Sequence, residues 1–316
     1  MIRLSIVMIK SAPLDTRFHL QFQVCESGFL LREYLQQKGI SKRTLTATKY
    51  DGGKLMVNGI ERTVRHRLIP GDIVDVFFPP EEISNGLIVE NGDLTILYED
   101  EAIIIVDKPP GQSTIPSYDH PSGTVANMLA GKFTRERIPV TVHIVTRLDR
   151  NTSGLICIAK NRHIHHLFGL QMANSNFHRK YEAIVEGHIE KDEFTIEEPI
   201  GRKNGSIIER VVREDGQYAR TDIQVLKRFK KDGHNLTRVA MVLQTGRTHQ
   251  IRVHMNWFGH PLMGDDLYGG SQTLISRQAL HCALLRFKHP LTGEDKEFSS
   301  VMPDDMKLLI NYVNCK

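Results

Sequence analysis

The sequence predicts an α+β protein with a small N-terminal domain and a larger domain built on a central mixed, mostly antiparallel β-sheet flanked by helices. Segments with strand alternation outnumber segments with helical spacing, and the two kinds do not alternate regularly as in a doubly wound parallel sheet. The 316 residues also exceed the usual size of one domain. We expect the small domain over residues 1–83, a linker over 84–93 and the larger domain over 94–316.

The small domain is expected to contain two short helices. Leu31, Tyr34 and Leu35 recur at helical spacing, and Gly39 follows as a natural helix end. Ser41 then has the hydroxyl of a helix N-cap, which predicts a second helix directly after it.

Turn signals predict the strands of this domain. Asn58-Gly59 is a hairpin signal, and the Pro-Gly-Asp turn at 70–72 leads into an alternating strand that ends at Phe78. The apolar stretch from Leu4 to Ile9 is too short to cross a membrane and is expected to be a first strand.

The N-terminal region carries most of the net positive charge. Residues 1–83 hold 12 Lys and Arg against 9 Asp and Glu, whereas the whole chain has a net charge of +4. Lys42, Arg43 and Lys49 fall on the second predicted helix, where they could contact a polyanion such as RNA. An ordinary solvated surface is the alternative.

Strands dominate the larger domain. They are expected within segments 94–111, 154–161, 180–189, 219–229 and 237–246, and helices within 124–133, 163–174 and 247–259. The basic stretch Lys227–His234 is expected to be a loop.

Asp149 is the first candidate for chemistry, although a carboxylate between Arg147 and Arg150 in a turn is usually just solvated. Tyr181 begins a predicted strand, where a tyrosine is normally half-buried core. Arg252 lies near a predicted helix start, where the helix dipole disfavours a cation, so we expect an anionic partner nearby.

The helix around Arg252 offers further polar groups. If the helix begins directly after Gly246, His249 and Asn256 share one face with Arg252, and Ile251, Met255 and Phe258 form the apolar face. The turn at Arg247 could approach a phosphate.

Three segments together resemble the RluA/RluD-type RNA pseudouridine synthases. They are TRLDRNTSGL around Asp149, KYEAIVEG around Tyr181 and TGRTHQIRVHM around Arg252. VDKPPG, GDDLYGG and ALHCALLRFKHPLTGE resemble further segments of the same family. Residues 1–83 resemble the S-four-like, or αL, RNA-binding domain.

The resemblance implies roles for individual residues. Asp149 would be the catalytic aspartate, Tyr181 would stack on the target uracil and take its C5 proton, and Arg252 would pair with Asp149. Arg147 would fill the gap that the uridine leaves in the RNA stack. The substrate-binding candidates are Lys108, Arg147, Arg247 and His249, and the RNA-binding candidates are Lys42, Arg43 and Lys49.

The implied reaction breaks the N1–C1′ bond of uridine, rotates the base and joins C5 to C1′. Bond cleavage builds oxocarbenium-like charge, and a nearby arginine favours the ionised form of a carboxylate that acts on it. No net redox change or hydrolysis occurs, so we expect no cofactor. His163, His165 and His166 lack accompanying cysteines or carboxylates, so we expect solvated histidines and no metal.

One position departs from the family pattern, because Thr146 stands where the family has histidine. A non-catalytic RNA-binding or ribosome-assembly factor on the same fold is therefore the second hypothesis, and a nucleoside glycosidase is a weaker third. The RNA would be ribosomal RNA or tRNA, and the protein a cytoplasmic monomer without a membrane partner. The four cysteines, without close pairing, fit a reducing compartment, and Trp257 is expected in the core.

Overall fold

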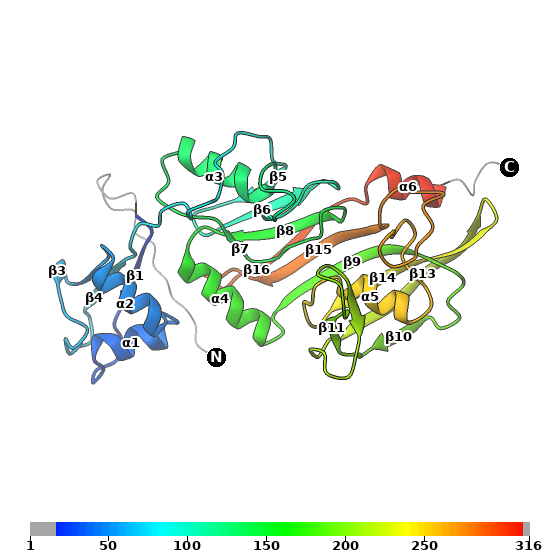
Figure 1. The fold of residues 1–316 in the computed structure, drawn as a ribbon. Helices are drawn as coiled ribbons and strands as arrows, with labels where there is room; N and C mark the ends of the chain where they lie inside the picture. The colour runs from blue at the N-terminus through cyan, green and yellow to red at the C-terminus, as the bar shows by residue number, and fades with distance from the viewer. Residues whose placement is uncertain (1–16, 312–316) are drawn as a thin grey trace.

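The described residues of the N-terminal domain form a four-stranded antiparallel sheet in the order β1-β4-β2-β3 with two helices on it. The computed structural model describes residues 17–311 (Figure 1). The elements are β1 (His19–Gln23), α1 (Leu31–Gln37), α2 (Lys42–Tyr50), β2 (Lys54–Val57), β3 (Ile60–Glu61) and β4 (Ile73–Phe77). The strand expected within residues 4–9 lies outside the described residues.

The expected turn chemistry of this domain is confirmed. The Ser41 hydroxyl accepts a hydrogen bond from the Thr44 amide at the start of α2. Asn58 and Gly59 both have positive φ, 52° and 76°, which fits the twist of a two-residue hairpin between β2 and β3. These local signals are sufficient to fix the two helices, the hairpin and the strand that follows Gly71.

The segment after β4 lies against the larger domain. Phe78 stacks on His163 with ring centroids 5.1 Å apart. The Glu81 carboxylate accepts a hydrogen bond from the Arg162 amide and also bonds His143. Residues 84–93, expected to be a linker, contain no helix or strand.

Ten strands form the sheet of the larger domain. Its main path runs β10-β13-β14-β9-β15-β8-β6-β5, with β16 paired to β15 and β7 paired to β8. The strands are β5 (Ile96–Glu99), β6 (Ile103–Lys108), β7 (His143–Ile144), β8 (Ser153–Ala159), β9 (Phe177–Glu186), β10 (Glu193–Ile196), β13 (Thr221–Lys231), β14 (His234–Leu243), β15 (Leu280–Lys288) and β16 (Asp295–Ser299).

Only the β8–β15 pair of this sheet is parallel among the described residues, so the expected mixed, mostly antiparallel sheet is confirmed. At this pair Gly154 lies so close to the neighbouring strand that a Cβ would be 2.3 Å from the Cys282 carbonyl oxygen. The close approach explains why a glycine stands at the start of β8, just after the turn that follows Asp149.

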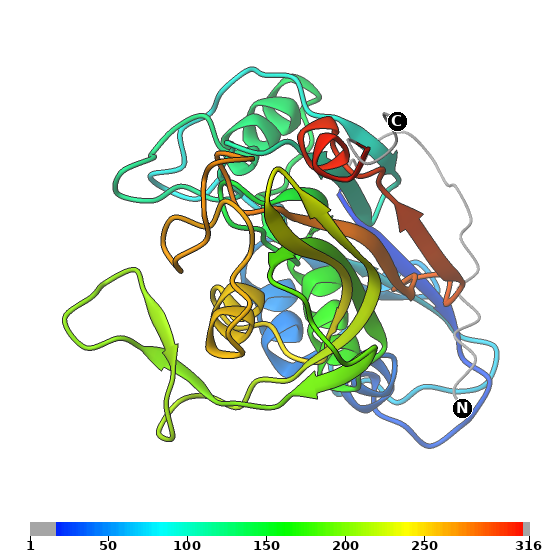
Figure 2. The ribbon, with the colours of Figure 1, turned by 90° about the vertical axis from the view of Figure 1, so that its right-hand side faces the viewer.

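Four helices and a small hairpin complete the larger domain. The helices are α3 (Val125–Arg135), α4 (Arg162–Ala173), α5 (Gln250–Trp257) and α6 (Asp304–Asn311), and the hairpin consists of β11 (Ile200–Arg202) and β12 (Arg210–Val212). Helix α4 packs against β7, β8 and β9, whereas α5 packs against β12 and β13. Figure 2 shows the β11–β12 hairpin, in yellow-green, projecting from the sheet beside α5.

Two expectations are wrong. The stretch Lys227–His234 is not a loop, because β13 continues to Lys231 and only Asp232 and Gly233, both with positive φ, form the turn into β14. Trp257 is not in the core but 52% exposed. It lies on the side of α5 opposite the expected apolar face, whose residues Ile251 and Met255 are buried.

Candidate active site

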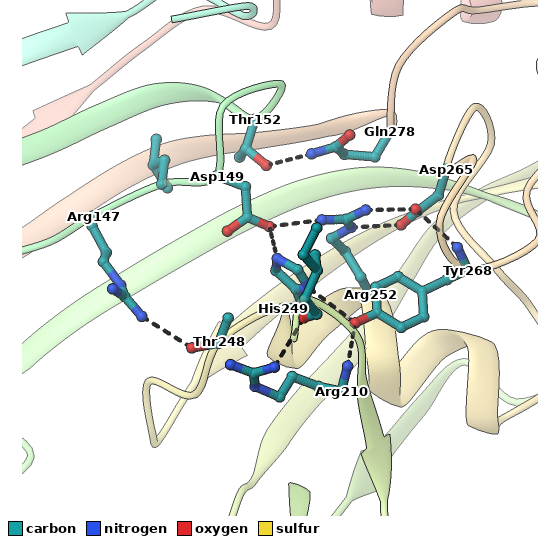
Figure 3. Close-up of polar contacts among 12 residues, drawn as sticks. Arg147, Asp149, Thr152, Arg210, Thr248, His249, Arg252, Asp265, Tyr268 and Gln278 are labelled. Atoms are coloured by element: carbon teal, nitrogen blue, oxygen red, sulfur yellow. Dashed lines mark hydrogen bonds and ion pairs between the residues drawn. The ribbon is translucent and has the colours of Figure 1, made fainter. Parts of the chain in front are cut away.

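A cleft brings together the three residues that were expected to act on the substrate. Asp149 enters from the loop between β7 and β8, Tyr181 from β9 and Arg252 from α5, and all three line the cleft. Arg147, Arg247 and His249 line it as well. Segments that are about 100 residues apart in the sequence therefore form one site (Figure 3).

Arg252 is held by two carboxylates. Its Nε and Nη2 atoms donate to the two oxygens of Asp265, both at 2.7 Å, while Nη1 donates to Asp149 Oδ2 at 3.1 Å. Burial by itself would lower the pKa of Arg252, but hydrogen bonds and charge from Asp265, then Asp149, raise it above its usual value. The anionic partner predicted from the helix position is present, together with a second one.

Asp265 was not singled out from the sequence, although it lies within the GDDLYGG segment. Its carboxylate is fully buried, whereas that of Asp149 is 30% exposed. The preceding Gly264 has φ +79°, and a Cβ there would lie 2.1 Å from the Arg277 carbonyl oxygen. This tight turn places Asp265 beneath α5, and a buried carboxylate of this kind is stable only with a cation beside it.

His249 lies before α5 rather than within it, because the helix begins at Gln250 and His249 has a left-handed backbone with φ 57°. Its Nε2 is 3.8 Å from Asp149 Oδ2, and its Nδ1 is 2.9 Å from the Tyr268 hydroxyl. Burial lowers the pKa of His249, against the opposing charge of Asp149. Asn256, expected on the same face, is exposed.

The loop that carries Asp149 is fixed by threonine hydroxyls. Thr114 Oγ1 bonds both the carbonyl and the amide of Leu148, at 2.8 and 3.1 Å. Thr146 is buried, and its hydroxyl accepts from the Cys157 amide at 2.9 Å. Thr146, which departs from the family pattern, therefore ties the loop to β8.

Two buried cations lie behind the same loop. The Lys108 ammonium donates to the carbonyl oxygens of Pro109, Gln112 and Arg150 at 2.8, 2.8 and 3.1 Å. Burial lowers its pKa to about 7, against the opposing charge of Asp149. Arg277 donates to the Asn151 carbonyl at 3.0 Å and forms a two-pronged ion pair with Asp305 of α6.

Lys108 was expected to contact the substrate, yet its side chain is only 1% exposed and lies outside the lining of the cleft. Its three carbonyl partners use all three N–H donors of an ammonium. Lys108 therefore lies under the loop that carries Asp149 and supports the backbone of that loop.

The Tyr181 ring forms one wall of the cleft. The residue is 5% exposed, and β9 pairs it with Met241 of β14 and Cys282 of β15. Burial, followed by the neighbouring Cys282, raises the pKa of its phenol well above the usual value. The side chain is therefore a neutral aromatic surface at physiological pH.

A basic groove continues from the cleft towards the β11–β12 hairpin. Its lining includes Arg147, Arg202, Arg210 and Arg247. Arg147 is exposed and donates to the Thr248 hydroxyl at 3.0 Å, and Arg247 donates to the Tyr218 carbonyl at 2.9 Å. Lys42, Arg43 and Lys49 lie elsewhere, exposed on α2 of the N-terminal domain.

The histidines of α4 differ from one another in burial. His163 was expected to be solvated, but its side chain is buried and stacks on Phe78. Burial lowers the pKa of His163 to about 4. Within residues 17–311, no group of three or more His, Cys, Asp or Glu side chains is arranged to hold a metal ion. None of the helices in that part of the chain is long and apolar enough to cross a membrane.

Comparison with known proteins places this site in context. A family model described as RNA pseudouridylate synthase matches residues 102–257. The uncharacterized RNA pseudouridine synthase YjbO of Bacillus subtilis is 46% identical over 284 residues, which cover 90% of this chain and 99% of that protein. Ribosomal large subunit pseudouridine synthase D of Pseudomonas aeruginosa is 37% identical over 280 residues, 83% of this chain and 84% of that protein.

A solved structure is also similar. Human RNA pseudouridylate synthase domain containing 1 aligns with a TM-score of 0.55 at 28% sequence identity, covering 68% of this chain and 86% of that chain. The matched family segment spans Asp149, Tyr181 and Arg252, the three residues that meet in the cleft.

Proposed function

Because the chain belongs to the RluA/RluD-type family of RNA pseudouridine synthases, we propose that it converts specific uridines of ribosomal RNA to pseudouridine with Asp149 as the reactive group. The name of the Pseudomonas relative, a large-subunit synthase, supports ribosomal RNA as the substrate, and tRNA is the alternative. Two buried free thiols, Cys157 and Cys282, support a reducing cytoplasm as its location.

One observation carries the role of Asp149. Its Oδ2 accepts a hydrogen bond from Arg252, and among residues 17–311 no donor is bound to its Oδ1. Arg252 is itself fixed by the buried Asp265, so it cannot follow Asp149 away from the cleft. One oxygen is thereby oriented and the other is left for a substrate atom, as a preorganised catalytic carboxylate requires.

The chemistry needs a carboxylate and an enclosed base. The Asp149 carboxylate would attack C1′ of the ribose or remove a proton from C2′, which releases uracil from C1′. The uracil then turns, and C5 bonds to C1′ as the Asp149–C1′ bond breaks or, on the second route, as C2′ regains its proton. The C5 proton then leaves and N1 gains a proton. The neutral Tyr181 ring supports stacking against the uracil, and its raised pKa favours this role over that of a phenolate base.

The charge around the cleft suits an RNA strand. Arg147 is exposed at the rim and would take the place of the extruded uridine. The groove arginines would neutralise backbone phosphates on either side. The N-terminal domain, residues 1–83, would hold more distant RNA through Lys42, Arg43 and Lys49, with residues 94–316 acting as a monomeric catalytic domain.

The test maps pseudouridines by carbodiimide labelling and primer extension in ribosomal and transfer RNA. Cells without the gene, and the same cells carrying the wild-type gene or Asp149→Asn, are compared. We expect one or more ribosomal sites to be lost with the gene, restored by wild type and not restored by Asp149→Asn.

Sites lost from tRNA would replace ribosomal RNA as the substrate. Identical maps in all three strains would support the assembly-factor hypothesis. Restoration by Asp149→Asn would contradict the role proposed for Asp149.

A further inference from the structure

We infer that Tyr268 is a positioning residue that holds His249 as the tautomer protonated on Nε2, and that His249 is a hydrogen-bond donor to the reacting uridine. The second half of the inference rests on the function proposed above. Tyr268 belongs to the same GDDLYGG segment as Asp265, and His249 belongs to the segment that precedes α5.

Tyr268 lies behind His249, out of the cleft. It is 6% exposed and lines neither part of the cleft, whereas His249 lines both. Its ring centroid is 5.0 Å from Cζ of Arg252, and its amide donates to Asp265 Oδ1 at 3.2 Å. The ring is thus fixed by the same ion pair that fixes Arg252 (Figure 3).

The hydrogen bonds of the Tyr268 hydroxyl assign the proton on His249. The Arg210 amide donates to this oxygen at 3.0 Å, and the oxygen lies 2.9 Å from His249 Nδ1. Within the described residues these are its two polar partners. A phenol has one proton to donate, so that proton goes to Nδ1, which must then be unprotonated.

The opposite tautomer is unfavourable. If Nδ1 carried the proton, the Tyr268 oxygen would face two donors, and its own buried proton would have no acceptor. A neutral imidazole whose Nδ1 accepts carries its proton on Nε2. The ring therefore presents an N–H group, and not a lone pair, towards Asp149.

The Nε2 donor is available for a substrate. It is 3.8 Å from Asp149 Oδ2, beyond hydrogen-bond distance, and that oxygen already accepts from Arg252. A uracil carbonyl oxygen or a ribose hydroxyl between them would complete the bond. His249 in this state has no lone pair on Nε2, so it cannot accept the C5 proton there.

The charged groups that face His249 oppose one another. Asp149 and Asp265 favour the cationic imidazole, Arg252 and Arg210 disfavour it, and burial is the largest influence on its pKa, which it lowers. The neutral donor form is consistent with this balance.

The same hydroxyl also fixes the β11–β12 hairpin, because Arg210 begins β12. Arginines of this hairpin, Arg202 and Arg210, line the basic groove beside the cleft. RNA that docks in the groove therefore contacts β12, the strand that supports Tyr268. Through Tyr268 this contact acts on the Nε2–H donor of His249 in the cleft.

The direct test is spectroscopic. A two-bond proton–nitrogen correlation spectrum of the full chain, with ¹⁵N-labelled histidine and His249→Gln for assignment, reports which ring nitrogen carries the proton. We expect a neutral ring protonated on Nε2 at pH 7.5, and a change in the Nδ1 shift in Tyr268→Phe. A proton on Nδ1 in the wild-type protein would overturn the inference.

Kinetics provide the functional test. The amide nitrogen of glutamine reaches the place of Nε2, whereas that of asparagine reaches the place of Nδ1. We expect the kcat of His249→Gln to be about tenfold higher than that of His249→Asn. A difference of about tenfold in rate is what one hydrogen bond to the transition state contributes. Equal losses in the two variants, or a more active asparagine variant, would contradict the donor role.

Tyr268→Phe should lower kcat about tenfold, with KM for the RNA changed less than twofold. Tyr98→Phe is the matched control, because it also removes a hydroxyl bonded at 2.8 Å, to Asp100, far from the cleft. Wild-type kcat in Tyr268→Phe would sink the positioning role.

Failure of this inference differs from failure of the proposed function. An inactive Asp149→Asn protein together with a proton on Nδ1 removes only the inference, whereas an active Asp149→Asn protein removes the function and leaves the tautomer assignment intact.

Discussion

The two walls of the cleft are held by different interactions. The loop with Asp149 is fixed mainly through its backbone, by the hydroxyl of Thr114 and the ammonium of Lys108. The α5 wall is fixed through a side chain, by the two-pronged bond between Arg252 and the buried Asp265. Among the described residues, the Asp149 carboxylate is thus placed with only its Oδ2 in a hydrogen bond, while the guanidinium of Arg252 is bound by two carboxylates.

The difference predicts that damage to the α5 wall has the larger effect. Asp265→Asn removes the counter-ion of a buried guanidinium and should lower the free energy of unfolding by about 3 kcal/mol. Arg252 would then shift towards Asp149, and kcat should fall about 100-fold. Asp192→Asn is the control for both the unfolding free energy and kcat. It removes the carboxylate that pairs with Arg228, and that carboxylate is 82% exposed. Unchanged kcat in a folded Asp265→Asn protein would contradict this view of the α5 wall.

Thr114→Val tests the loop wall. The substitution keeps the side-chain shape but removes both hydrogen bonds to Leu148, which should cost about 2 kcal/mol of unfolding free energy and lower kcat about tenfold. Thr134→Val removes a hydroxyl bonded to the Ala130 carbonyl in α3 and should lose stability without losing kcat. If both variants behave alike, Thr114 has no special effect on Asp149.

Lys108 predicts a pH dependence of stability. Its native pKa of about 7 lies below its unfolded value near 10.5, so between these pH values the unfolded chain binds more protons. The free energy of unfolding of the wild type should rise relative to Lys108→Met from pH 7 to pH 10. We expect roughly 1 kcal/mol, because the three carbonyl partners offset part of the burial effect. Urea titrations at the two pH values measure it, and a fall would contradict the burial assignment.

The smallest effect is expected at Thr146. Thr146→Val should cost about 1 kcal/mol through loss of the hydrogen bond to the Cys157 amide, whereas Thr146→Ser keeps the hydroxyl and should match the wild type. Thermal unfolding compares the two. Equal stability of the valine and serine variants would show that the hydroxyl does not hold the loop.

The residues that meet in the cleft were easier to predict from the sequence than the residues that support them. Asp149, Tyr181 and Arg252 were found because each lies in a long, specific segment, and the position of Arg252 near a helix start predicted a nearby anion. Thr114 and Arg277 are common residue types in unremarkable surroundings, and only the folded sheet brings them behind the loop. Their function depends on contacts between distant segments, which no local pattern records.

The wrong predictions for the stretch Lys227–His234 and for Trp257 each have a cause in the local sequence. The Asp232-Gly233 pair is a two-residue hairpin signal. The four basic residues of the stretch Lys227–His234 nevertheless suggest a loop, because Phe229 is the only apolar side chain in the stretch and gives no alternation. Trp257 was assigned to the core from its residue type, against the helical periodicity that places it outside. Small strands such as β11 and β12, three residues each, carry too few residues for a periodic signal.

We propose that Asp149 reacts while the two walls of the cleft hold it in place. The most direct measurement is release of tritium from an RNA labelled at C5 of uridine, in single turnover, by purified wild-type protein and Asp149→Asn, with the dissociation constant for the same RNA measured in parallel. We expect tritium release at background level from Asp149→Asn and an RNA affinity within about twofold of the wild type. Release by Asp149→Asn at a rate comparable to the wild type would contradict it.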